Sequence, residues 1–138
     1  MASTALDDMK VHVKLKLSAL WAALMFCYVY GDYFGLYVPG KLKGMLEGDG
    51  PIGPVSQGTL VVTSILLALP GVMVFLSLVL PPRLNRWLNI IFGAFYIAIM
   101  LITMPGAWDF YILLGIVEIV LTALIVWYAW SWPKRSTI

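Results

Sequence analysis

The segment from residue 109 to residue 130 reads DFYILLGIVEIVLTALIVWYAW, and Glu118 is the only charged residue in it after the first position. An α-helix rises about 1.5 Å per residue, so a segment of this length crosses the hydrocarbon core of a bilayer, which is roughly 30 Å thick. Pro133 follows shortly after its end, where a helix should stop. The segment therefore predicts a transmembrane helix.

Three further apolar segments precede it, at about residues 17–38, 58–80 and 87–104. A pair of turn residues that includes proline follows each of them: Pro39-Gly40, Pro81-Pro82 and Pro105-Gly106. These breaks agree with the hydropathy pattern. We therefore predict a single domain over residues 1–138, an all-α integral membrane four-helix bundle with up-down topology.

The composition indicates a membrane protein rather than a soluble one. Hydrophobic residues make up 62% of the 138-residue chain, charged residues make up 12%, and the mean hydropathy is +0.92. The formal net charge of +2 is too small for a nucleic-acid-binding surface. The single cysteine, Cys27, excludes an intrachain disulfide and a CxxC redox pair. We expect the lipid bilayer as the main partner and no nucleic acid.

The distribution of lysine and arginine predicts the orientation in the membrane. Most of the basic residues would lie on the side of the two termini: Lys10, Lys14, Lys16, Arg83, Arg86, Lys134 and Arg135. Only Lys41 and Lys43 would lie on the other side. Because short cytoplasmic loops are enriched in lysine and arginine, we predict a multi-pass protein with both termini in the cytoplasm.

Residues near the ends of the segments are assigned to anchoring and capping. Six tryptophans are predicted as interfacial anchors: Trp21, Trp87, Trp127, Trp130 and Trp132 at the inner boundary, and Trp108 at the outer one. Asp109 is predicted to cap the fourth helix and Asn85 the third. Residues 6–16 are predicted to extend the first helix toward the cytoplasm.

Two carboxyl side chains lie inside the apolar segments, Asp32 in the first and Glu118 in the fourth, and no lysine, arginine or histidine occurs there. At about 1.5 Å per residue, Asp32 lies roughly 9 Å and Glu118 roughly 13 Å from the outer ends of their helices, so the two could face one another. At least one would then be protonated or would bind a cation. The alternative is a neutral carboxyl that is hydrogen-bonded to Tyr28, Thr122 or a backbone carbonyl.

Pro70 interrupts the second segment and is followed by Gly71. Because proline has no backbone N–H, the Leu66 carbonyl loses its helical donor and we expect a kink. The kink could open a pocket or supply a carbonyl ligand; the alternative, which we favour, is a simple packing bend. Its depth is comparable with that of Glu118, so Pro70 and the two acids define a layer in which a small solute could be held.

Small residues recur at every fourth position of the first segment: Ala19, Ala23, Cys27, Gly31 and Gly35. Such a stripe lets another helix approach closely, and Gly31 with Gly35 forms a GxxxG step. The step is compatible with a homo-oligomer or with another membrane protein as partner, although packing within one bundle is the simpler explanation. Asp32 lies beside the stripe, so we expect its carboxyl to point into the bundle.

Catalytic and cofactor-binding signatures are missing from the sequence. It contains no GxSxG, P-loop, HExxH or cysteine-rich metal motif, and its only histidine, His12, precedes the first apolar segment. We therefore expect neither an enzyme nor a bound metal or cofactor.

Four stretches resemble a family of small four-span bacterial membrane proteins that is known only as a domain of unknown function. They are Lys-Leu-Ser-Ala-Leu-Trp at 16–21, Tyr-Gly-Asp at 30–32, Leu-Ser-Leu-Val-Leu-Pro-Pro-Arg-Leu-Asn-Arg-Trp-Leu-Asn-Ile at 76–90, and Glu118 with Trp-Tyr-Ala-Trp-Ser-Trp at 127–132. The resemblance implies that Asp32 and Glu118 are matching acids and that the protein lies in a bacterial inner membrane. Some members carry a further acid where this chain has Ala68, so a three-acid site is not implied.

These observations favour a proton- or cation-linked carrier or channel for a small solute, with Asp32 and Glu118 as the binding residues. The alternative is a non-catalytic accessory or scaffolding subunit that binds another membrane protein. The two hypotheses predict different structures. A cavity that touches both acids favours transport, whereas tight packing around hydrogen-bonded acids favours a scaffold.

Overall fold

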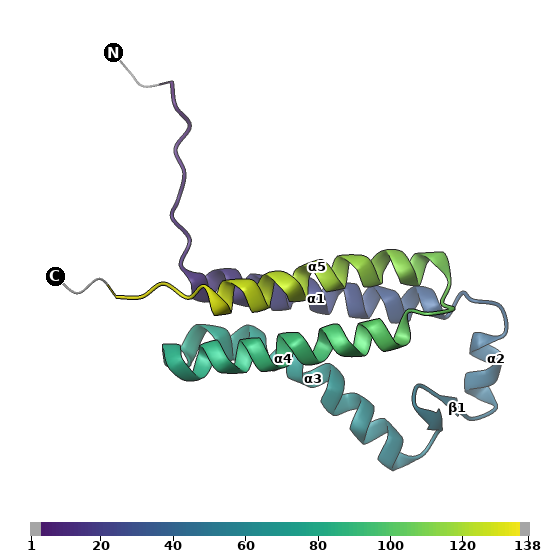
Figure 1. Ribbon diagram of the computed structural model, residues 1–138. Coiled ribbons are helices and arrows are strands. Elements are labelled where there is room, and N and C mark those ends of the chain that lie inside the picture. Colours follow the sequence, from purple (N-terminus) through teal and green to yellow (C-terminus); the bar gives the residue numbers. More distant parts are fainter. Residues whose placement is uncertain (1–3, 136–138) are drawn as a thin grey trace.

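The computed structural model describes residues 4–135 and shows a helical bundle (Figure 1). Four long helices form it: α1 (Val13–Gly35), α3 (Gln57–Val79), α4 (Pro82–Thr103) and α5 (Asp109–Trp130). Each is long and apolar enough to cross a membrane. The helices run alternately in opposite directions, so α1 begins and α5 ends at the same end of the bundle, which we call the terminal end. The predicted all-α membrane four-helix bundle is confirmed.

A short connection at the opposite end, which we call the loop end, joins α1 to α3. It contains the helix α2 (Lys41–Leu46) and the two-residue strands β1 (Asp49–Gly50) and β2 (Gly53–Pro54), which pair in antiparallel fashion. Gly40 precedes α2 with a φ of 80°, a left-handed conformation that glycine adopts without strain. This turn lets the chain reverse, so that α2 lies beside the loop end of the bundle (Figure 1).

The bounds of the helices differ from those of the apolar segments at two places. The helix α4 begins at Pro82 rather than near residue 87, because proline suits the first position of a helix and Asn85, which follows it, is buried in the bundle. The helix α1 begins at Val13, and residues 4–12 run away from the bundle without forming a helix (Figure 1). The predicted extension of the first helix over residues 6–16 is therefore wrong for residues 6–12. His12 caps α1 instead, because its Nδ1 accepts a hydrogen bond of 3.1 Å from the Lys14 amide.

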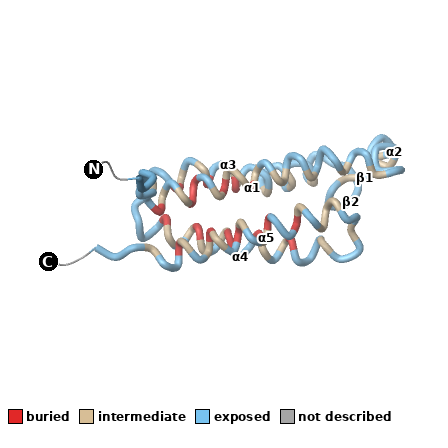
Figure 2. The backbone as a smooth tube through the Cα atoms, turned by 90° about the horizontal axis from the view of Figure 1, so that it is seen from above, coloured by how far each residue is buried: buried red, intermediate tan, exposed pale blue. Residues whose placement is uncertain are grey.

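The helices α1 and α5 form the centre of the bundle. α1 packs against α3 and α5, and α5 also packs against α4, whereas the consecutive helices α3 and α4 make few contacts with each other. The fully buried large apolar side chains gather in the half nearer the terminal end: Leu17, Trp21 and Leu24 of α1, Met73 of α3, and Ile125 of α5. Figure 2 shows that the buried residues of α3 also lie in this half. The largest fully buried apolar side chains are therefore concentrated in the terminal half.

Two glycines allow α4 and α5 to approach each other closely. A Cβ atom on Gly93 would lie 2.8 Å from Val126 Cγ2, and a Cβ atom on Gly115 would lie 2.9 Å from Met104 Sδ. Hydrophobic driving force is weak between helices that lipid surrounds, so close packing of this kind is a main source of stability. The contact surface of α4 and α5 therefore depends on these two glycines.

The small-residue stripe of α1 lies at the edge of the packed surface rather than at its centre. Ala19 is exposed, whereas Ala23, Cys27, Gly31 and Gly35 are half-buried. A Cβ atom on Gly31 would make an ordinary contact of 3.5 Å with Leu114, and one on Gly35 would meet no atom within 4 Å. The stripe therefore meets α5 at Gly31 without the closest approach that glycine allows, and the homo-oligomer stays a prediction.

A network of buried polar side chains joins α1, α3 and α4 in the terminal half. Trp21 Nε1 donates a hydrogen bond of 2.7 Å to Asn89 Oδ1. Asn89 Nδ2 in turn donates to Asn85 Oδ1 at 2.7 Å, and Asn85 Nδ2 donates to the Ser77 carbonyl at 2.7 Å. Interhelical hydrogen bonds in membranes contribute about 0.6–2 kcal/mol each. The network therefore fixes three helices relative to one another.

This network corrects two assignments made from the sequence. Trp21 is 0% exposed, so it is not an interfacial anchor. Asn85 is also 0% exposed, and Pro81 rather than Asn85 occupies the cap position of α4. The predicted cap at Asp109 is displaced by one position, because Trp108 is the capping residue of α5 and Asp109 is the first residue of the helix. Its carboxylate still lies where the helix dipole favours a negative charge.

Replacing Asn89 by leucine should destabilise the protein by roughly 1–3 kcal/mol, because Trp21 Nε1 would be left buried without an acceptor. Unfolding of the purified variant in detergent, followed by circular dichroism, measures the change. Ser64→Leu is the matched control, since the exposed Ser64 hydroxyl bonds only to the Leu60 carbonyl of its own helix. Equal effects of the two substitutions would show that the network does not stabilise the bundle.

Candidate functional site

A cavity of about 540 Å³ lies in the half of the bundle nearer the loop end. All four long helices contribute residues to its lining, and so do α2 and the turn between β1 and β2. Asp32, Glu118 and Tyr28 line it together. The structure therefore brings three of the residues singled out in the sequence into one site.

The cavity exists because the first half of α3 stands away from the other helices. No residue of α3 before Pro70 is buried, whereas Pro70, Met73 and Ser77 are. Figure 1 shows the same divergence, with the loop-end half of α3 leaving the bundle. Pro70 itself does not line the cavity. It lies between the packed and the diverging halves of the helix, where a missing N–H allows a helix to bend.

The backbone carbonyl that Pro70 leaves free finds a donor on another helix. The Tyr96 hydroxyl of α4 donates a hydrogen bond of 2.6 Å to the Leu66 carbonyl. Both residues line the cavity. An unpaired carbonyl in the membrane costs several kcal/mol, and the phenol removes this cost without closing the gap between α3 and α4. Tyr96 therefore supports the bent form of α3.

Glu118 is the deepest acid of the site. Its side chain lines the cavity although the residue is only 4% exposed. Among the described residues, its Oε2 atom has no hydrogen-bond partner. A buried carboxyl group without a partner is costly, so such a group usually serves a bound ion, a proton or a ligand.

The hydrogen bonds expected around Glu118 are not formed. The Thr122 hydroxyl donates to the backbone carbonyls of Glu118, at 2.7 Å, and of Ile119, at 3.1 Å, and not to the carboxyl group. Thr122 also does not line the cavity. Tyr28 lies within electrostatic range of Glu118, but no hydrogen bond joins the two in residues 4–135. The hydrogen bond expected from Thr122 to the carboxyl group is therefore not formed.

Asp32 lies closer to the loop end and is more exposed than Glu118. It is within electrostatic range of Glu118 on one side and of Lys41 on the other. From the sequence, Lys41 was expected only to be a basic residue of the loop opposite the termini. The order of the residues does not indicate that the turn at Gly40 folds α2 back toward α1. The site therefore contains one ammonium group, and it lies near Asp32.

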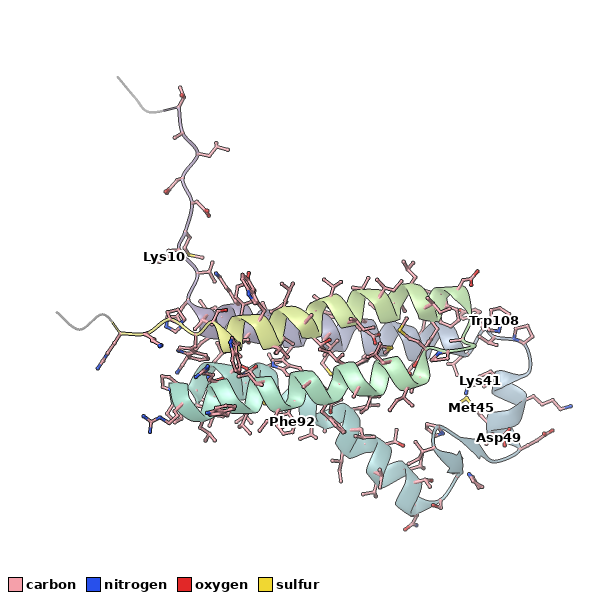
Figure 3. All side chains as sticks on the ribbon, in the orientation of Figure 1. Lys10, Lys41, Met45, Asp49, Phe92 and Trp108 are labelled. Atoms are coloured by element: carbon pink, nitrogen blue, oxygen red, sulfur yellow. The ribbon has the colours of Figure 1, made fainter. Side chains whose placement is uncertain are left out.

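Residues of α2 and β1 line the cavity at its loop end. Lys41, Met45 and Asp49 lie on the side of this connection that faces the bundle (Figure 3). Asp49 packs directly against α2, since a Cβ atom on Gly44 would lie 2.6 Å from its Oδ2 atom. The connection between α1 and α3 therefore forms part of the site rather than a separate surface.

Tyrosines supply most of the aromatic surface of the cavity. Tyr28, Tyr96 and Tyr111 all line it, and the rings of Tyr28 and Tyr96 are 6.1 Å apart. Tyr111 donates a hydrogen bond of 3.1 Å to Thr103 Oγ1. Of these three tyrosines, only Tyr28 was expected at the site from the sequence. Helical spacing was an available signal, because Tyr28 precedes Asp32 by one helical turn and Tyr111 precedes Glu118 by two.

The chemistry of the site is that of carboxyl, phenol and ammonium groups. Within residues 4–135, no three histidine, cysteine, aspartate or glutamate side chains come together as ligands for a metal ion. A buried carboxyl without a partner can take up and release a proton, or can neutralise a bound cation. The arrangement can therefore bind positive charge inside the bundle.

Comparison with known proteins supports the resemblance seen in the sequence. None of the curated proteins and none of the solved structures matches the chain. One family model does match it, over residues 6–138, and is described as a family of unknown function. That range includes the helices, the loop connection and the three acids that line the cavity, so the chain belongs to the family of unknown function DUF6326.

Proposed function

We propose that this small membrane protein carries or conducts a small solute, and that Glu118 and Asp32 bind the proton or cation linked to its movement. One observation supports this most strongly. The cavity touches both acids, and the buried Oε2 atom of Glu118 has no hydrogen-bond partner in the described residues. A scaffold would be expected to pack tightly around such a group or to satisfy it with a hydrogen bond.

The depth of Glu118 supports the same proposal. Glu118 lies nine residues after Asp109, the first residue of α5, and twelve residues before Trp130, the last. At about 1.5 Å per residue these separations are roughly 13 Å and 18 Å, which puts the carboxyl near the middle of the membrane. Carriers commonly bind their solutes and coupling ions at this depth.

The proposal includes an orientation. Most lysines and arginines belong to the terminal end of the bundle, and by the positive-inside rule this end faces the cytoplasm. In a bacterial inner membrane the cavity would then lie in the outer half of the bilayer. The solute would enter from outside, and its release inward would require the packed half to open.

A second candidate is an accessory subunit that binds another membrane protein. The observation that favours it is the small-residue stripe of α1, whose first member, Ala19, is exposed and whose other members are only half-buried. Purification in mild detergent distinguishes the two candidates. A partner bound in fixed ratio, together with absence of flux from the isolated protein, would support the accessory subunit.

The transport proposal is tested in proteoliposomes that contain a pH-sensitive dye. We expect the protein to mediate proton movement when a sodium, potassium or membrane-potential gradient is imposed. Glu118→Gln should lower the rate by about tenfold or more, a ratio equivalent to about 1.4 kcal/mol, because the amide cannot take up a proton. Asp32→Asn should have a smaller effect, since Asp32 is more exposed and is near Lys41.

Asp109→Asn is the matched control for this experiment. Asp109 is on the same helix as Glu118, but it lies at the helix end and does not line the cavity. Its substitution should leave the rate unchanged. Rates equal to those of protein-free liposomes, or an unchanged rate in Glu118→Gln, would contradict the proposal.

A further inference from the structure

The charge of the cavity favours a positively charged ligand. Three carboxyl groups line it, those of Asp32, Asp49 and Glu118, against the single ammonium group of Lys41. Lys41 lies within electrostatic range of Asp32, at the loop end of the cavity. Glu118 is deeper, and no basic residue lies beside it among those that line the cavity. Its carboxyl is therefore the group available to neutralise a ligand.

The size of the cavity and its polar atoms argue against a bare inorganic ion as the sole ligand. An inorganic cation without water needs several oxygen ligands, roughly six to eight in the case of Ca²⁺. Within residues 4–135, no three histidine, cysteine or acidic side chains come together as such a ligand set. A volume of about 540 Å³ is also that of a pocket for an organic molecule.

The walls of the cavity suit an organic cation. The rings of Tyr28 and Tyr96 lie side by side, 6.1 Å apart and inclined at 45°. Aromatic faces attract cations, and more strongly where water is excluded. Leu66, Ile99 and Leu114 provide apolar surface in the same cavity. The site thus combines one deep carboxyl, aromatic rings and an apolar wall.

We infer that the cavity binds a monovalent organic cation, whose charged group lies against Glu118 and Tyr28 and whose apolar part contacts α3 and α4. This inference rests on the proposed function, because it names the chemical class of the solute that the protein would carry or conduct. It can be tested without any transport, since the cavity is present in the isolated chain.

Equilibrium dialysis of the purified protein in neutral detergent is the test, with tetraphenylphosphonium as the probe. Tetraphenylborate is the control ligand, because it has the same shape and the opposite charge. We expect saturable binding of the cation and none of the anion. Glu118→Gln should weaken binding at least about tenfold, and Glu118→Asp, which keeps the charge, should restore most of it. Asp109→Asn should bind as the unchanged protein does.

Several results would overturn the inference. They are equal binding of the two probes, an affinity unchanged in Glu118→Gln, or absence of saturable binding by a protein that remains folded. Thermal unfolding of each variant shows whether it is folded, and Glu118→Asp controls for a local defect in Glu118→Gln. Binding of the probe without proton flux would support the binding site and contradict transport. Proton flux that depends on Glu118, without probe binding, would support transport and contradict the organic cation.

Discussion

Replacing Glu118 by leucine should make the folded protein more stable, by roughly 2 kcal/mol, while it removes the function of the site. The substitution removes a buried carboxyl oxygen that has no hydrogen-bond partner in the described residues. Leucine is apolar and of similar size, and the neighbouring cavity provides room for its branched side chain. Most substitutions of buried residues destabilise proteins, so a gain here would be diagnostic.

Unfolding of the variant in mixed detergent micelles, at several denaturant concentrations, measures this gain. Glu118→Gln should give a smaller one, because the amide is polar but uncharged. Val117→Leu is the control on the neighbouring exposed position and should change stability by less than about 0.5 kcal/mol. Loss of stability in Glu118→Leu would mean that the carboxyl holds the bundle together, and the argument for a functional site at Glu118 would then fail. A gain in stability together with loss of binding is the pattern of a residue retained for function.

Replacing Pro70 by alanine should close the cavity. Alanine restores the N–H that the Leu66 carbonyl lacks, so a straight helix becomes favourable and the hydrogen bond from Tyr96 becomes unnecessary. The first half of α3, of which no residue is buried, would then pack toward α4. The prediction is that residues in the cavity lose their access to solvent.

A reporter cysteine measures this access. Thr103 lines the cavity from α4, and Cys27 is the chain's only native cysteine. In a Cys27→Ala background, Thr103→Cys should react with a water-soluble maleimide about tenfold more slowly when Pro70→Ala is added, equivalent to about 1.4 kcal/mol in favour of the closed form. Pro54→Ala, in β2 and outside the long helices, is the matched control and should leave the rate unchanged. An unchanged rate in Pro70→Ala would show that the proline does not hold the cavity open.

Much of the fold could be predicted from the sequence, because the membrane restricts what an apolar segment can form. Four apolar runs, each followed by a proline turn, correspond to the four long helices. The start of α4 was missed because a polar residue there is buried by a partner on another helix. Asn85 makes this segment look like a loop, yet it is 0% exposed and its amide donates to the Ser77 carbonyl of α3. A linear pattern does not show such partners.

The candidate site was predicted in part, for a related reason. Depth in a membrane can be counted along a helix, so the acids Asp32 and Glu118 could be expected near each other. Residue spacing reveals neither how α4 is rotated about its axis nor how the connection between α1 and α3 folds. Tyr96 and Lys41 were therefore missed. Thr122 was assigned to the wrong acceptor, because a threonine hydroxyl in a helix reaches the carbonyl one turn earlier in its own chain.

The uneven contacts of α3 have a mechanical consequence. Its second half is tied to α1 and α4 by buried hydrogen bonds, whereas no residue of its first half is buried and the Tyr96 hydroxyl joins that half to α4. A half-helix with no buried residue can pivot at Pro70, where the backbone lacks an N–H donor. Lateral pressure and bilayer thickness would then act directly on the width of the opening. We therefore expect lipid composition to influence how wide the cavity opens.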